Sequence, residues 1–139
     1  MNVAAILAKK GMGVITIRPE ESIRDAIASL AEHNIGALVA VNEAGKPVGI
    51  LSERDIVRAA AKNEQLFSQT VENLMTTNVT VGVPQDALRP VVHTMTEKHF
   101  RHLPIMDQGK LVGIVSMGDV VKAQRDEYEG ELETLDDQI

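Results

Sequence analysis

The chain has 139 residues, of which 44% are hydrophobic and only 2% aromatic, so any core is built from aliphatic side chains. It contains no cysteine, which excludes disulfides, thiolate catalysis and cysteine-ligated zinc. Residues 126–139 hold seven of the 20 acids and no base, which leaves 13 acids against 14 bases in the rest of the chain. A body this close to neutral argues against nucleic-acid binding, which needs a clustered basic face.

No apolar run approaches the roughly 18 residues that a membrane helix requires. The apolar N-terminal residues 1–7 are too few for the core of a signal peptide, and the lysines follow them rather than precede them. We therefore expect a soluble cytoplasmic protein.

The first half of the chain predicts a β-α-β-β-α unit. A β-rich run at residues 14–17 leads to a helix that Ser22 can cap, with Asp25 at its third position. Apolar runs at residues 37–41 and 48–51 predict two strands joined by a glycine-containing turn. The sequence Ser-x-x-Asp at residues 52–55 then opens a second helix.

The second half predicts the same order of elements. It has a β-rich run at residues 79–81, apolar runs at 103–106 and 111–115, and a second Ser-x-x-Asp at 116–119. Pro90 falls inside the expected first helix, where it would cause a kink unless it lies in the first turn. We therefore place the start of that helix near Asp86. The acidic residues 126–139 either prolong the last helix or form a frayed tail.

The two halves are copies of one unit. Residues 49–57 and 113–121 share five identities in nine positions at an offset of 64, and the offset becomes 65 upstream of a turn that has lost one residue. Even the lead-in segments recur, as residues 3–7 and 71–75. We expect an α/β (α+β) fold of two repeats, 1–66 and 67–125, packed sheet to sheet because neither has much core alone, followed by the acidic extension 126–139.

The repeated Ser-x-x-Asp carries the candidate chemistry. Each copy lies where an apolar strand ends and a helix begins, so its hydroxyl can cap the helix or meet a phosphate. The carboxylate of Asp55 or Asp119 can accept two hydrogen bonds, which suits the cis-diol of a ribose. The same spacing is that of a capping box that only starts a helix, and the spacing does not decide between the two.

Arg101 and His102 precede a predicted buried strand, where a guanidinium and an imidazole can hold a phosphate or simply face solvent. The matching residues of the first copy, Gly36 and Ala37, cannot do this, so we expect two unequal sites. His99 and His102 are three positions apart, but a predicted helix-to-strand break separates them and no carboxylate joins them in sequence, so they do not form a metal site. No Ser-His-Asp order, phosphate loop or Walker-type lysine is present. The sequence predicts neither a metal site nor an enzyme.

The duplicated Gly-Ile-x-Ser-x-x-Asp, with Arg-His-Leu-Pro at residues 101–104, resembles the pair of CBS domains over about residues 2–125. The resemblance implies two repeats about a pseudo-twofold axis, and two clefts that hold AMP, ADP, ATP, NAD or S-adenosylmethionine. It also implies a face-to-face homodimer. Carried over residue by residue, it implies that Asp55 and Asp119 bind ribose hydroxyls. The further ligand-binding residues that it implies are Thr16, Ala37, Ser52, Arg54, Thr80, Arg101, His102, Leu103 and Ser116.

The resemblance implies that the cleft of Asp119 is the better phosphate site, because Arg54 and Arg101 both reach it. Thr80 follows a different local spacing from Thr16, which puts their equivalence in doubt. We therefore expect a regulatory sensor of adenine nucleotides that acts by population shift on an unidentified partner protein or on its own oligomeric state. The alternatives are a ligand-free structural dimer, an enzyme such as a nucleotide hydrolase or a relative of IMP dehydrogenase, and a single-stranded nucleic-acid binder, for which aromatic residues are too few.

Overall fold

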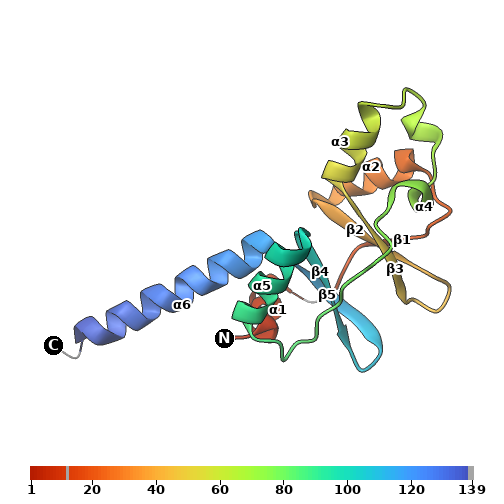
Figure 1. Cartoon of the computed structure of the whole chain (residues 1–139). Helices are drawn as coiled ribbons and strands as arrows, with labels where there is room; N and C mark the ends of the chain where they lie inside the picture. Colours follow the sequence, from red (N-terminus) through yellow and green to blue (C-terminus); the bar gives the residue numbers. More distant parts are fainter. Residues whose placement is uncertain (12, 138–139) are drawn as a thin grey trace. The chain divides into compact units, whose positions relative to one another are not determined.

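The computed structural model describes residues 1–11 and 13–137 and divides them into two compact units (Figure 1). One unit is Val14–Thr80, which we call the first-repeat unit. The other combines Met1–Gly13 with Val81–Ile139, and we call it the second-repeat unit. These contact-based units differ from the sequence repeats, because the N-terminal segment packs with the second repeat and residues 67–80 pack with the first. The repeat boundary expected after residue 66 stays a prediction.

The first-repeat unit is a three-stranded sheet with helices. Its elements are β1 (Thr16–Ile17), α2 (Ile23–His33), β2 (Ala37–Val41), β3 (Pro47–Ser52), α3 (Glu53–Ala60), the 3-10 helix η1 (Leu66–Ser68) and α4 (Val71–Leu74). Strand β2 lies in the centre, parallel to β1 and antiparallel to β3. Ser22 caps α2 as predicted, since its Oγ accepts the Asp25 N–H at 3.1 Å. Ile23, Leu38 and Leu51 are fully buried and anchor the core.

The second-repeat unit is built on a two-stranded antiparallel sheet. Its elements are α1 (Val3–Lys10), α5 (Leu88–Lys98), β4 (His102–Asp107), β5 (Lys110–Ser116) and α6 (Met117–Asp137). The strand predicted at residues 79–81 is not formed. Gly82 alone bridges Ile105, and its main chain bonds Pro104 and Met106 at 2.9 and 2.8 Å. This bridge corresponds to the pairing of Ile17 with Ala40, so Val81 rather than Thr80 occupies the place of Thr16.

Helix α5 begins at Leu88, two residues later than predicted. Asp86 instead closes a turn with Val83, whose N–H donates to Asp86 Oδ2 at 2.9 Å and whose carbonyl accepts the Asp86 N–H at 3.1 Å. Pro90 is therefore the third residue of the helix. The N–H groups of the first turn have no acceptor within a helix, so a proline there interrupts no hydrogen bond. The apparent conflict between Pro90 and the helical pattern disappears.

The two lead-in segments are exchanged between the repeats. In the second-repeat unit the main chain of Val3 donates to Asp86 at 2.9 Å, and Leu7 lies directly against Gly113. In the first-repeat unit the equivalent donor is Val71, to Glu21 at 2.8 Å, and Met75 lies directly against Gly49. The next residues make equivalent hydrogen bonds as well. The Ala4 N–H donates to the Pro84 carbonyl, and the Glu72 N–H donates to the Pro19 carbonyl. Each lead-in thus covers the last strand of the other repeat, at a glycine that permits close approach.

The acidic extension is helical. Helix α6 continues without interruption from Met117 to Asp137, whereas the last two residues lie outside the described part of the chain. Tyr128 and Leu135 on the extension are exposed. Within residues 1–11 and 13–137, no helix combines the length and the apolar character needed to cross a membrane.

Candidate functional site

Two strand-to-helix junctions carry the repeated Ser-x-x-Asp. At the first, Ser52 Oγ accepts the Asp55 N–H at 3.2 Å, and Asp55 Oδ2 accepts the Ser52 N–H at 2.9 Å. At the second, the corresponding distances between Ser116 and Asp119 are 3.0 and 2.8 Å. Both junctions are therefore capping boxes, and the capping alternative raised by the spacing is realised twice.

Capping does not use up either carboxylate. Every hydrogen bond that Asp55 and Asp119 accept goes to Oδ2, and within the described residues neither Oδ1 has a partner. Both side chains are half-buried, so each Oδ1 remains open to an incoming hydroxyl group. A junction of this kind can start its helix and still accept a ligand.

The two carboxylates differ in their electrostatic surroundings. Lys10 Nζ lies 2.7 Å from Asp119 Oδ2 and 3.0 Å from the carbonyl oxygen of Ile114. Burial raises the pKa of Asp119, but the hydrogen bonds from Lys10 and Ser116 outweigh it and hold that pKa below its ordinary value. Asp55 has no cation at ion-pair distance among the described residues. The charge of Asp119 is thus compensated and that of Asp55 is not.

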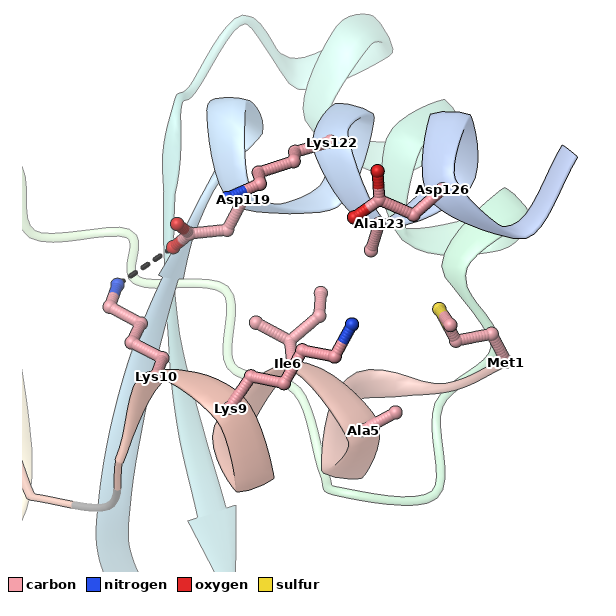
Figure 2. Close-up of a pocket in the computed structure, with 9 residues that line it drawn as sticks. All are labelled: Met1, Ala5, Ile6, Lys9, Lys10, Asp119, Lys122, Ala123 and Asp126. Atoms are coloured by element: carbon pink, nitrogen blue, oxygen red, sulfur yellow. Dashed lines mark hydrogen bonds and ion pairs between the residues drawn. The ribbon is translucent and has the colours of Figure 1, made fainter. Parts of the chain in front are cut away.

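A cavity of about 280 Å³ opens beside Asp119, between α1 and the start of α6 (Figure 2). The Lys10–Asp119 pair lies at one end of the cavity, and Met1 and Asp126 lie at the other. The residues that line it are Met1, Ala5, Ile6, Lys9, Lys10, Asp119, Lys122, Ala123 and Asp126. Sequence reasoning missed this cavity, because Lys10 is 109 positions from Asp119. The one available signal was the lysine pair, Lys9 and Lys10, that follows the first lead-in.

The predicted residues at the starts of the strands lie beside these junctions. His102 pairs with Ser116 across the sheet, and the carbonyl of Arg101 accepts the Met117 N–H at 2.8 Å. In the first-repeat unit Ala37 pairs with Ser52, and Gly36 accepts the Glu53 N–H at 3.0 Å. The equivalent positions therefore meet the same part of each junction, although only the second carries side chains that can bind an anion.

The remaining predicted residues are placed less uniformly. The side chains of Ala37 and Leu103 are buried, and Leu103 belongs to the core cluster of the second-repeat unit. Thr16 is exposed on β1, and Arg54 is exposed in the first turn of α3. Thr80 lies at the end of the first-repeat unit, outside any strand. That Arg54 and Arg101 act on one ligand stays a prediction. No group of three potential metal-ligating side chains occurs in the part of the chain that the structure describes.

Two α/β repeats, each with a strand-end Ser-x-x-Asp and with exchanged lead-ins, define a tandem-repeat module. The sequence model of the CBS domain matches residues 5–62 and 71–126, and the chain belongs to the CBS domain family. Pairs of CBS domains are typically regulatory modules that bind ligands. The family expected from the duplicated motif is thereby confirmed, together with the α/β fold of two repeats.

Solved structures resemble the whole fold. The CBS-domain protein Atu1752 from Agrobacterium tumefaciens is 38% identical, with a TM-score of 0.85 over 89% of this chain and 99% of that one. The CBS domain pair of MJ0100, solved with 5′-methylthioadenosine and S-adenosyl-L-methionine, is 32% identical, with a TM-score of 0.80 over 91% of this chain and 98% of that one.

The curated relatives include an enzyme. The CBS domain-containing protein YhcV of Bacillus subtilis is 34% identical over 111 residues, which are 80% of this chain and 79% of that protein. The L-aspartate semialdehyde sulfurtransferase of Methanocaldococcus jannaschii is 35% identical over 107 residues, but these are 76% of this chain and only 20% of that enzyme.

Proposed function

We propose that this chain is a regulatory, non-catalytic module that binds an adenosine-containing ligand and passes the signal to a partner protein or to its own oligomeric state. The observation that carries the proposal is the open Oδ1 of Asp55 and of Asp119, each half-buried at a strand-to-helix junction. A carboxylate in this position accepts hydrogen bonds from the hydroxyl groups of a ribose.

The ligand class is supported by the MJ0100 pair, whose complex contains two adenosine derivatives. AMP, ADP, ATP and NAD present the same ribose, and so does S-adenosylmethionine. Arg101 and His102 lie in sequence and in main-chain position beside the junction of Asp119, and their side chains are of the kinds that bind phosphate. The cytoplasmic location expected from the sequence stays a prediction.

Thermal unfolding with a panel of adenosine ligands tests the proposal. A ligand at about 100 times its dissociation constant stabilises the folded state by roughly 2.7 kcal/mol. We expect Asp119→Ala to weaken binding of AMP more than Asp55→Ala does, because only the second junction has Arg101 and His102 beside it. Asp25→Ala is the matched control, since Asp25 also lies at the third position of a helix but follows no strand end. Equal losses from the two junction variants would contradict the ranking.

A ligand-free dimerisation module is the second candidate. Val57 on α3 and Val121 on α6 are equivalent positions of the two repeats, and their exposed fractions are 68% and 51%. Exposed valines on two helices suit an interface with a second copy of the chain. Sedimentation of Val57→Glu and Val121→Glu, with and without AMP, separates the candidates. A dimer that these variants disrupt, in a chain that no adenosine ligand stabilises, would favour the purely structural function.

A further inference from the structure

The cavity beside Asp119 carries an excess of positive charge. Three lysines line it, Lys9 and Lys10 from α1 and Lys122 from α6, together with the carboxylates of Asp119 and Asp126. Lys10 is paired with Asp119. Lys9 and Lys122 have no ion-pair partner within residues 1–11 and 13–137. Two unpaired ammonium groups therefore face one unpaired carboxylate.

We propose that this cavity binds the anionic group of the ligand whose ribose Asp119 holds, so that the second-repeat unit selects phosphate-bearing adenosine ligands over neutral or cationic ones. The inference rests on the proposed function and adds the ligand class of one of its two sites. It assigns Lys9 and Lys122 to phosphate binding, in addition to the residues that the family resemblance implied.

The geometry at Asp119 allows both contacts at once. Lys10 and the Ser116 N–H occupy Oδ2, so a ribose hydroxyl can bind Oδ1 without displacing the lysine. Lys10, whose ammonium group pairs with Asp119, lies at the end of the cavity that Figure 2 shows, within reach of a phosphate on such a sugar. Figure 2 also shows Lys9 projecting between α1 and α6. Lys9 thus offers an ammonium group farther along the cavity, whereas the side chain of Lys122 runs along α6 toward Asp119.

The size and the lining of the cavity fit part of a ligand. Its volume of about 280 Å³ is just below the range of roughly 300–1,000 Å³ typical of pockets for a whole small molecule. It accommodates a phosphate group while the nucleoside remains at the junction. Ala5, Ile6 and Ala123 supply an apolar floor, and charges act more strongly beside apolar surface than in open water.

The other junction has no such arrangement. Asp55 has no cation at ion-pair distance among the described residues, so no ion pair offsets its charge. The five residues that follow the second lead-in, 76–80, are all uncharged. A phosphate at this junction meets a negative charge without lysines to offset it. We therefore expect the first-repeat unit not to discriminate in favour of phosphate.

Calorimetric titration of the full chain tests the proposal. An Asp55→Ala background restricts strong binding to the second-repeat unit, and the probes are AMP, which carries phosphate, and adenosine, which does not. The double substitution Lys9→Met and Lys122→Met removes two charges but keeps side-chain length. We expect it to weaken AMP binding roughly three- to tenfold and to change adenosine binding less than about twofold. Lys110→Met is the control, because Lys110 is an exposed lysine of β5 outside the cavity.

A charge change of the opposite sign strengthens the test. Asp126→Asn removes the unpaired carboxylate, so we expect tighter AMP binding and unchanged adenosine binding. Equal effects of the lysine substitutions on AMP and adenosine, or no effect on either, would overturn the assignment while leaving the proposed function intact. A chain that binds neither AMP nor adenosine, with a normal melting curve, would overturn both proposals together.

Discussion

Replacing Gly113 by alanine tests whether α1 packs on β5 as the structure places it. The added methyl group would lie 2.7 Å from Leu7 Cδ2, and Leu7 is only 4% exposed, so its side chain has little room to move. We expect Gly113→Ala to lower the free energy of unfolding by about 1–3 kcal/mol, the usual effect of overpacking. Leu7→Ala alone deletes a buried side chain and should lower it by about 2–5 kcal/mol.

The two substitutions should not add. In the Leu7→Ala chain, the methyl group at position 113 points into the space that the leucine has left. Gly113→Ala then has almost no effect, or returns up to about 0.8 kcal/mol for one buried methyl group. The coupling between the substitutions is therefore at least about 1 kcal/mol, whereas substitutions at distant sites add to within roughly 0.5 kcal/mol.

Urea unfolding followed by far-ultraviolet circular dichroism measures the free energy of unfolding of the four proteins in this double-mutant cycle: the unchanged chain, the two single variants and the double variant. If the slope of the unfolding free energy against urea concentration is the same in all variants, they expose the same surface area on unfolding. Gly130→Ala serves as the control, because its new methyl group meets no atom within 4 Å and it lies in α6. We expect that variant to be about 0.5–1 kcal/mol more stable. Additive effects of Leu7→Ala and Gly113→Ala would refute the packing of the first lead-in on the second repeat.

Three further predictions concern single elements. Because the pKa of Asp119 is lowered in the folded state, its pairing stabilises the fold above the ordinary carboxyl pKa, and this stabilisation is lost as the pH falls through the lowered value. Lys10→Met should therefore reduce the difference in unfolding free energy between about pH 6 and about pH 3, and an unchanged difference would contradict the pairing. Ser52→Ala removes a cap of α3 and should cost about 1 kcal/mol in urea unfolding; a neutral result would argue against the capping box. Pro90→Ala should change the free energy of unfolding by less than about 0.5 kcal/mol. An increase in that free energy of about 3 kcal/mol would instead place Pro90 in a helix interior.

The local elements of the fold could be predicted because local signals specify them. Ser22, Ser52 and Ser116 each precede a helix by one residue and bond the third residue of it, as their spacing indicated. The strand at residues 79–81 was predicted wrongly. Its β-forming residues have no partner strand at that position, and the neighbouring Gly82 makes the bridge to Ile105 instead. Strand formation depends on a partner as well as on propensity.

The exchange of the lead-ins could not be predicted in the same way. Residues 3–7 and 71–75 resemble each other, which indicates that they have equivalent structural positions. The similarity does not show which of the two sheets each segment covers. That choice is decided by contacts across more than a hundred residues, such as Leu7 with Gly113. The cavity beside Asp119 depends on the same exchange, because residues of α1 line it. Local sequence patterns therefore could not predict it.

The difference between the two junctions arises from the lengths of the lead-in helices rather than from the Ser-x-x-Asp motifs. Helix α1 runs for eight residues and carries Lys10 to the carbonyl oxygen of Ile114 and to Asp119. Helix α4 has four residues, and the chain after it pairs through Thr76 with Ile50, whose carbonyl accepts the Thr76 N–H at 2.9 Å. The acceptor that Lys10 uses in one unit is thus occupied by main chain in the other.

A lysine introduced after α4 would therefore lack the second anchor that positions Lys10 on Asp119. Under the proposed function, the charge preference of the Asp119 junction is determined by α1, a segment that belongs, in sequence, to the other repeat. A change in the first lead-in alters the site of the second repeat without touching its motif, and two sites that look alike in sequence can differ in the ligand charge that they accept.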